Sequence, residues 1–250
     1  MKRRHELLAS QKMGRRMHLW CYGHWGTPLL VFPSAAGMAH EWDAHGMVDT
    51  LGDLIEEGQL KLYCTESNVA EAWTRQQNPP DWRIGRHQTF EAYVTTELVS
   101  FIRRDCQSPE ISIGVAGCSL GGYYAANFAL KFPEIFRYAL CMSGRYDITG
   151  FTGGFSNLDV YFNNPMAYVP NLEGAHLERV QKNTHLALVC GQGPWEEGCI
   201  EETNALADIL ASKGISHHRD IWGHDVAHDW NWWRRQARYH LVQRFGAEPS

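Results

Sequence analysis

The chain has 250 residues, of which 44% are hydrophobic and 20% charged, and its formal net charge is −5 at pH 7. These values are typical of a globular protein with one sizeable core, so we expect a single domain over residues 1–250. The negative charge argues against nucleic-acid binding, and no stretch has the apolar length of a membrane-spanning helix. The basic opening lacks the apolar stretch of a secretory signal, which favours a cytoplasmic protein.

The first elements expected are strands at Met17–Tyr22 and Pro28–Phe32, separated by a turn-like segment that would let them pair as a hairpin. A helix follows at about Met47–Glu57, where apolar residues recur on one face, and Gly58 stands where that helix would end. The next apolar run, Leu60–Cys64, reads as a strand.

The stretch from Glu66 to His87 is rich in Trp, Asn, Gln and Pro and shows no clear period, so we expect a surface loop that contributes substrate contacts. A long helix is predicted after it, from the spacing of apolar residues between Phe90 and Ile102. Ile111–Ala116 then reads as a strand that runs into a helix at Gly121–Phe132.

The last third of the chain continues the alternation of strands and helices. Residues 151–182 are expected to be an insertion over the site, with helix-like Leu158–Tyr168 as their only clear element. The remaining elements expected are strands at Tyr138–Met142, Leu186–Cys190 and His218–Trp222 and helices at Glu201–Ser212 and Trp230–Phe245. The whole pattern predicts an α/β fold with a largely parallel sheet covered by helices.

Seven cysteines are spread along the chain, and they form no Cys-x-x-Cys pair. Most of them lie in apolar runs. This distribution predicts reduced, buried thiols rather than a disulfide framework or a zinc site.

A candidate nucleophile lies in Gly117-Cys118-Ser119-Leu120-Gly121, between a predicted strand and a predicted helix. A nucleophile elbow forces its serine into a strained backbone conformation, where neighbours larger than glycine would collide. The alternative is a glycine-rich turn with a solvated serine. The position between strand and helix favours Ser119 as the nucleophile, with the Cys118 side chain pointing away from the cleft.

A serine hydroxyl needs a base, and in this fold the partners follow in the order serine, acid, histidine. His224 and His228 both follow the last predicted strand. We favour His228, because it stands just before the aromatic helix that begins near Trp230, and expect His224 to have a structural or supporting role. The spacing of the two histidines would also suit a metal, but no glutamate lies between them and no helix is predicted there, so we expect no metal.

The acid that orients the imidazole should follow a strand between the serine and the histidine. The loop after Leu186–Cys190 contains Glu196 and Glu197, and the loop after Tyr138–Met142 contains Asp147. The two glutamates also suit the acidic N-terminus of a helix. All three residues remain candidates on position alone.

Attack of the serine on a carbonyl group would form an oxyanion, which requires two backbone N–H donors. Leu120, directly after the nucleophile, supplies the first. The second should come from the loop at residues 32–37, where small side chains would admit a carbonyl group; Ala35 is the first choice and Ser34 the next.

The segments Gly117–Gly122 and Ala227–Trp233 together resemble the esterase D / antigen 85 branch of the α/β hydrolases, which includes S-formylglutathione hydrolases, feruloyl esterases and mycolyltransferases. The resemblance implies ester hydrolysis or acyl transfer by a Ser-acid-His triad without a cofactor. It supports Ser119 as nucleophile, His228 as base, and Leu120 with the Ala35 region as oxyanion donors.

The same resemblance ranks the acids. The loop that contains Glu196 is similar to the antigen 85 arrangement, which places Glu196 first, Glu197 second and Asp147 third. The chain departs from the family pattern in two places: Phe32-Pro33-Ser34 stands where many relatives have His-Gly or Asp-Gly, and the acid loop lacks the common Gly-x-x-Asp.

Three functions are compatible with these residues. The first is a carboxylesterase or thioesterase acting on a small-molecule ester, and the second an acyltransferase with the same triad. The third is a non-catalytic binding protein, because ten tryptophans could build an exposed platform. No nucleic-acid or membrane partner is expected, and the sequence leaves open whether the chain forms a homo-oligomer.

Overall fold

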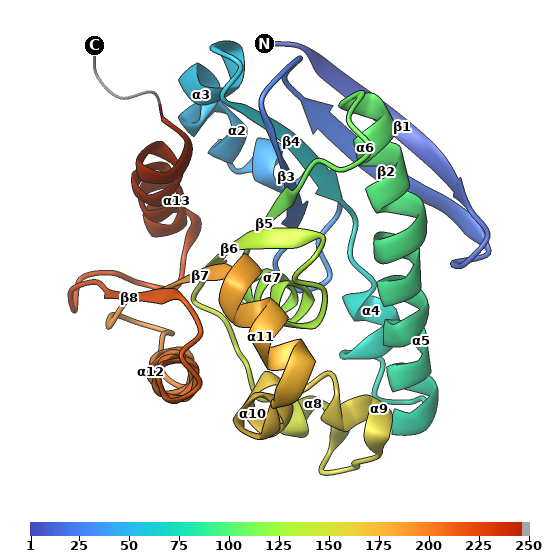
Figure 1. Ribbon diagram of the computed structural model, residues 1–250, viewed down its shortest axis with the longest axis vertical. Helices are drawn as coiled ribbons and strands as arrows, with labels where there is room; N and C mark the ends of the chain where they lie inside the picture. Colours follow the sequence, from blue (N-terminus) through green and yellow to red (C-terminus); the bar gives the residue numbers. More distant parts are fainter. Residues whose placement is uncertain (247–250) are drawn as a thin grey trace.

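The computed structural model describes residues 1–246 and contains an eight-stranded sheet in the order β1-β2-β4-β3-β5-β6-β7-β8 (Figure 1). β1 pairs with β2 and β2 with β4 in antiparallel fashion, whereas the pairs from β4 to β8 are parallel. The strands are β1 Arg3–Ser10, β2 Arg15–Tyr22, β3 Thr27–Phe32, β4 Leu60–Thr65, β5 Ile113–Cys118, β6 Phe136–Met142, β7 His185–Cys190 and β8 His217–Ile221.

Helices cover both faces of this sheet. They are α1 Glu41–Ala44, α2 Met47–Thr50, α3 Gly52–Glu56, α4 Val69–Ala72, α5 Pro80–Ala92, the π-helix η1 Tyr93–Leu98, α6 Val99–Asp105, α7 Leu120–Lys131, α8 Thr149–Thr152, α9 Leu158–Tyr161, α10 Pro165–Tyr168, the 3₁₀-helix η2 Val169–Asn171, α11 Gly174–Asn183, α12 Cys199–Ser212 and α13 Trp230–Phe245. In Figure 1, α2, α3 and α13 lie on one side of the sheet and α5, α6 and α7 on the other.

The central strands read as apolar runs because both of their faces are buried. In β3, Leu30 and Phe32 belong to the core beside α5 and α7, whereas Leu29 and Val31 belong to the core beside α1–α3 and α13. This is the alternation that a period of two dictates. The predicted α/β class with a mostly parallel sheet is therefore confirmed.

The expected hairpin of the first two strands is wrong, because β4 lies between β2 and β3. β2 pairs instead with β1, a strand that the sequence analysis missed. Along β1 exposed and half-buried residues alternate, and three of its first four residues are charged. Charged side chains are a common feature of edge strands, and here they concealed the apolar pattern.

The expected surface loop at residues 66–87 is also wrong. The stretch contains α4 and the first half of α5, and Trp73 and His87 are fully buried. The Trp73 indole N–H donates to the Tyr124 hydroxyl oxygen at 3.0 Å. The segment escaped recognition because its few buried aliphatic residues, Val69, Ala72 and Ile84, follow no clear period, and its other buried residues are aromatic or polar.

Residues 151–182 contain more structure than expected. The single helix at Leu158–Tyr168 is replaced by α9 and α10, and the Asn164 side chain caps α10, which begins at Pro165. The sequence analysis also missed α11, in which Val180 is the one buried residue. Within residues 1–246, no helix combines the length and apolar character needed to cross a membrane.

Candidate active site

Ser119 lies at the sharp turn between β5 and α7. Its φ of 56° and ψ of −123° are a conformation that residues with a side chain rarely adopt. A Cβ on Gly117 would overlap the carbonyl group of Gly121, and a Cβ on Gly121 would lie 2.5 Å from the carbonyl oxygen of Phe32. Both glycines are therefore required by close backbone approach, as in a nucleophile elbow.

The elbow exposes one side chain and buries its neighbour. Ser119 is half-buried, whereas Cys118 has no exposed surface and belongs to the core on the α13 side of the sheet. Burial holds the pKa of the Cys118 thiol well above its usual value. Cys118 thus points away from the site, as the sequence analysis expected.

His228 and Glu196 meet across two loops. Nδ1 of His228 lies 3.1 Å from Oε2 of Glu196, which is 1% exposed. Glu196 lies in the loop between β7 and α12, and His228 in the loop between β8 and α13. The Asp229 side chain accepts hydrogen bonds from the N–H groups of Asn231 and Trp232, so α13 begins at residue 230 and leaves His228 in the loop.

The buried Glu196 carboxylate is fully hydrogen-bonded. Oε1 accepts from the Ser143 hydroxyl at 2.6 Å and from the Gly191 N–H at 3.4 Å. Oε2 accepts from His228 and from the Cys190 thiol, the latter at 3.4 Å. Burial is the largest influence and raises the pKa of Glu196, but the hydrogen bonds from His228 and Ser143 outweigh it, so the pKa lies below its ordinary value of 4.5. The carboxylate is therefore ionised at neutral pH.

The other acid candidates lie elsewhere. Glu197 is exposed. Asp147 accepts hydrogen bonds from the N–H and hydroxyl of Thr149 and from the Asn164 side chain. Of the three candidates, only Glu196 is brought to His228.

His224 does not have the supporting role expected for it. Its side chain is exposed, and among residues 1–246 it has no hydrogen-bond partner. His224 lies in a turn closed by a hydrogen bond from the Val226 N–H to the Gly223 carbonyl oxygen at 3.1 Å.

The loop after β3 contains the candidates for the second oxyanion donor. The Ser34 N–H donates to the Glu41 carboxylate at 2.7 Å, and the Ser34 hydroxyl donates to the same group at 2.9 Å. Ala35 has a φ of 42° in a tight turn closed by a bond from the Gly37 N–H to the Ser34 carbonyl oxygen. Among residues 1–246, neither the Ala35 nor the Leu120 N–H has a hydrogen-bond acceptor. Ser34 is therefore occupied, and Ala35 and Leu120 are available as donors.

Four strands present these groups at one edge of the sheet. Ser119 follows β5, Ser143 follows β6, Glu196 follows β7 and His228 follows β8. The strands are parallel neighbours, so their carboxyl ends meet at the same edge, where open α/β sheets bind ligands. Among the hydrogen bonds of residues 1–246, none joins Ser119 to His228.

One set of side chains could be considered for a metal. Ligand atoms of Glu196, Cys199 and His228 lie within 4.8 Å of one another. Burial raises the pKa of the Cys199 thiol to about 12, so this thiol is neutral near pH 7 when no metal is bound. The Nδ1 atom of His228 is also engaged with Glu196. These residues fit a hydrogen-bonded acid and base better than a metal centre.

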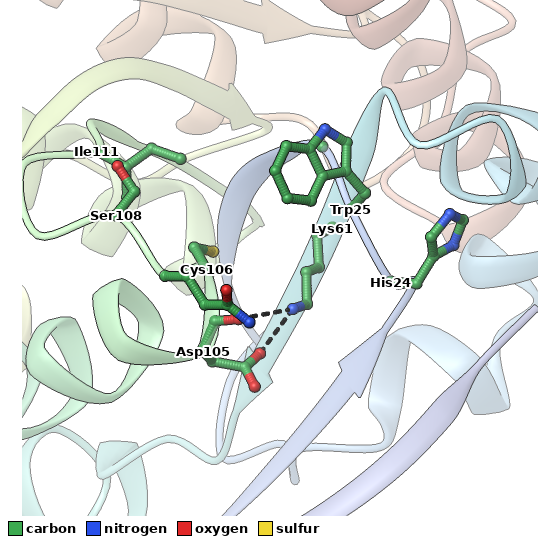
Figure 2. A pocket seen from close by; sticks show the side chains of 9 residues that line it. His24, Trp25, Lys61, Asp105, Cys106, Ser108 and Ile111 are labelled. Atoms are coloured by element: carbon green, nitrogen blue, oxygen red, sulfur yellow. Dashed lines mark hydrogen bonds and ion pairs between the residues drawn. The ribbon is translucent and has the colours of Figure 1, made fainter.

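A separate cavity of about 350 Å³ lies at the opposite end of the sheet (Figure 2). It is lined by residues at the starts of β3 and β4, including Trp25 and Lys61, and by the end of α6. Lys61 is nearly buried and its Nζ lies 2.7 Å from Oδ2 of Asp105. The cavity therefore faces the amino ends of the parallel strands, away from Ser119.

Sequence reasoning assigned no role to two residues that support the site, Ser143 and Trp233. The Trp233 indole N–H donates to the Ser143 hydroxyl oxygen at 3.0 Å, and the Trp233 ring lies edge-on to His228 with centroids 4.8 Å apart. Only the position of Ser143 directly after a parallel strand could have indicated a role.

The sheet and the elbow define an α/β hydrolase. The family described as "Putative esterase" matches residues 10–241, and the chain belongs to this family. It is a carboxylesterase-like hydrolase, as predicted. No curated protein sequence matches the chain.

Solved structures share the fold over nearly the whole chain. A ferulic acid esterase superposes with a TM-score of 0.75 at 16% identity, covering 98% of each chain. The S-formylglutathione hydrolase of Agrobacterium tumefaciens has a TM-score of 0.74 at 16% identity, covering 98% of this chain and 95% of its own. Mycobacterium tuberculosis MPT51 has a TM-score of 0.70 at 15% identity, covering 99% of each chain.

Proposed function

We propose that the protein hydrolyses a small carboxylic ester or thioester through an acyl-enzyme formed on Ser119, with His228 as base and Glu196 as acid. The observation that carries this proposal is the hydrogen bond of 3.1 Å between His228 and the buried Glu196, at the sheet edge where the elbow presents Ser119. A turn with a merely solvated serine has no need of a buried acid and histidine beside it.

The geometry supports a defined proton route. An ionised carboxylate can only accept, so His228 carries its proton on Nδ1 and Nε2 keeps a lone pair. Nε2 takes the proton of the Ser119 hydroxyl as Oγ attacks the carbonyl carbon of the ester. The carbonyl oxygen becomes an oxyanion, which the N–H groups of Leu120 and Ala35 would stabilise.

The second half of the reaction uses the same groups. The carbon–oxygen or carbon–sulfur bond to the leaving group breaks, and His228 returns the proton to the departing alkoxide or thiolate. A water molecule then gives its proton to Nε2 and attacks the acyl carbon, and the collapse of that intermediate releases the acid and restores Ser119.

The test is labelling and turnover of the folded protein. A fluorophosphonate probe is expected to form one adduct, mapped to Ser119 by peptide mass spectrometry, and p-nitrophenyl acetate is expected to be hydrolysed. Ser119→Ala should abolish labelling and remove nearly all turnover, leaving at most a residual rate about 10³-fold over water. Labelling of another residue, or turnover of more than a few per cent in Ser119→Ala, would refute the proposal. Product analysis with added alcohols then distinguishes water from another acyl acceptor.

A further inference from the structure

Ser143 occupies an unusual place behind the acid. It follows β6 directly, has no exposed surface, and adopts a φ of 49°, a region that favours glycine. Its N–H donates to the Val189 carbonyl oxygen at 2.7 Å, which fixes the backbone at the end of β7. Its hydroxyl oxygen lies 2.6 Å from Oε1 of Glu196 and 3.0 Å from Nε1 of Trp233.

The direction of these two hydrogen bonds is determined by the atoms themselves. An indole N–H can only donate, so the Ser143 oxygen accepts from Trp233. The hydroxyl has a single proton, which is then directed at Glu196. Glu196 must therefore accept on Oε1, and its other oxygen faces the Nδ1 atom of His228.

We propose that Ser143 and Trp233 are positioning residues that hold Glu196 as an ionised acceptor, so that His228 keeps its proton on Nδ1 and its lone pair on Nε2. This inference rests on the proposed function, since it assigns the support of the same acid and base. Neither residue touches the reacting atoms; both act through Glu196 and His228.

Trp233 holds both members of the pair. It is 4% exposed, its N–H holds Ser143, and its ring stands at 81° to the His228 ring. Through Trp233, α13 thus packs against the His228 ring and also orients the Ser143 hydroxyl that donates to Glu196. Trp233, in the aromatic segment at the start of α13, therefore contributes to the site as well as to the core.

The other titratable groups near Glu196, in addition to His228, are the thiols of Cys118, Cys190 and Cys199. Burial raises the pKa of all three thiols, that of Cys199 to about 12, so they are neutral near pH 7. Removing the Ser143 hydroxyl therefore takes one hydrogen bond from the Glu196 carboxylate and leaves the charges around it unchanged.

Loss of the hydroxyl has a predictable effect on pH dependence. With one donor fewer, the carboxylate attracts the Nδ1 proton of His228 more strongly, which favours the imidazolium. Because the imidazolium cannot act as a base, the acidic limb of kcat/KM should move to higher pH. A residue that only filled space would not move this limb.

The experiment compares Ser143→Ala and Ser143→Gly, because glycine relaxes the backbone at positive φ while both changes delete the hydroxyl. A hydrogen bond to a charged group is worth enough to lower kcat about 10- to 100-fold, with KM within about twofold. Both variants should shift the acidic limb equally, and both should move the downfield imidazole N–H proton resonance of His228. If wild type labels at Ser119 but both variants keep its kcat and pH profile, the inference is overturned while the proposed function stands.

Trp233→Phe tests the other link and does not depend on the folding of the Ser143 variants. It removes the N–H but keeps a ring against His228, and it should lower kcat about threefold to tenfold. Trp42→Phe is the matched control, because Trp42 is buried on the same face of the sheet and its N–H has no partner among residues 1–246. Trp42→Phe should leave kcat unchanged; an equal loss in both variants would overturn the role of the N–H.

Combining Ser143→Ala with Trp233→Phe should lower kcat little more than Ser143→Ala alone, because the N–H then has no hydroxyl to orient. A wild-type protein that neither labels at Ser119 nor hydrolyses the ester would overturn both the function and this inference.

Discussion

The backbone N–H of His228 donates to the carbonyl oxygen of Pro194 at 3.0 Å. Pro194 lies two residues before Glu196, so this bond ties the loop after β8 to the loop after β7. A second bond, from the Gly193 N–H to the Val226 carbonyl oxygen at 2.9 Å, joins the same two loops. Glu196 and His228 are thus held together through the backbones of their loops as well as their side chains, which fixes the geometry of the pair in advance.

Replacement of the acid by its amide separates the three carboxylate candidates. Glu196→Gln keeps the shape but its NH₂ group can donate to Nδ1, which favours the wrong imidazole tautomer; the loss for such a change reaches about 10⁴ in the serine proteases. We expect kcat for p-nitrophenyl acetate to fall at least a hundredfold. Glu197→Gln and Asp147→Asn are matched controls and should each lower kcat less than tenfold. A larger loss in either control than in Glu196→Gln would contradict the assignment.

The two histidines should differ sharply. His228→Ala removes the proposed base and should lower kcat as severely as Ser119→Ala, and combining the two changes should add little, because triad groups act as a unit. His224→Ala should leave kcat within about twofold, since its side chain is exposed and unbonded within residues 1–246. Steady-state kinetics at pH 8 measures all four proteins. Comparable losses for His224→Ala and His228→Ala would mean that the base is wrongly assigned.

The elbow glycines can be tested through stability. Gly121→Ala places a Cβ 2.5 Å from the Phe32 carbonyl oxygen, and forced overpacking of this kind typically lowers the free energy of unfolding by about 1–3 kcal/mol. Gly85→Ala is the control, because that helical position has nothing within 4 Å of the added Cβ and should gain about 1 kcal/mol. Urea unfolding followed by circular dichroism checks both values. A Gly121→Ala protein as stable as wild type would show that the close approach of α7 to β3 is not maintained in solution.

Some parts of the structure could be predicted from the sequence, and others could not. α13 begins and ends where the sequence analysis placed it, at Trp230 and Phe245, and the strand before Ser119 is displaced by only two residues. A single helix or strand can be recognised from the residues that compose it, because its signal lies within one short stretch of sequence. Ser143 and Trp233 are 90 residues apart, and their contact depends on how β6 and α13 pack, which no local pattern records. The acid was ranked through a family resemblance for the same reason: a hydrogen bond between two loops leaves no periodic trace.

The acid stability of the fold should depend on Asp105, at the end of the sheet opposite Ser119. Asp105 accepts hydrogen bonds from the Tyr63 hydroxyl at 2.7 Å and from Arg4 at 2.6 Å, and it is paired with Lys61. Burial alone raises the pKa of Asp105, but the bonds from Lys61, Tyr63 and Arg4 outweigh it and lower the pKa from 3.8 to about 2. Because the pKa is lower in the folded state than in the unfolded chain, the ionised carboxylate stabilises the fold above pH 3.8.

This contribution should be lost as the pH falls from about 3.8 to about 2. The neutral variant Asp105→Asn resembles the protonated acid, so its free energy of unfolding should lie below that of wild type near pH 6 and converge with it near pH 2. Urea unfolding at a series of pH values measures the difference between the two proteins, in which the other carboxylates cancel. Asp208→Asn is the control, because Asp208 is 73% exposed and its ion pair with Arg219 lies at the surface, where such pairs contribute little. A difference between wild type and Asp105→Asn that stays constant from pH 6 to pH 2, or one no larger than that for Asp208→Asn, would show that ionised Asp105 does not hold this end of the sheet.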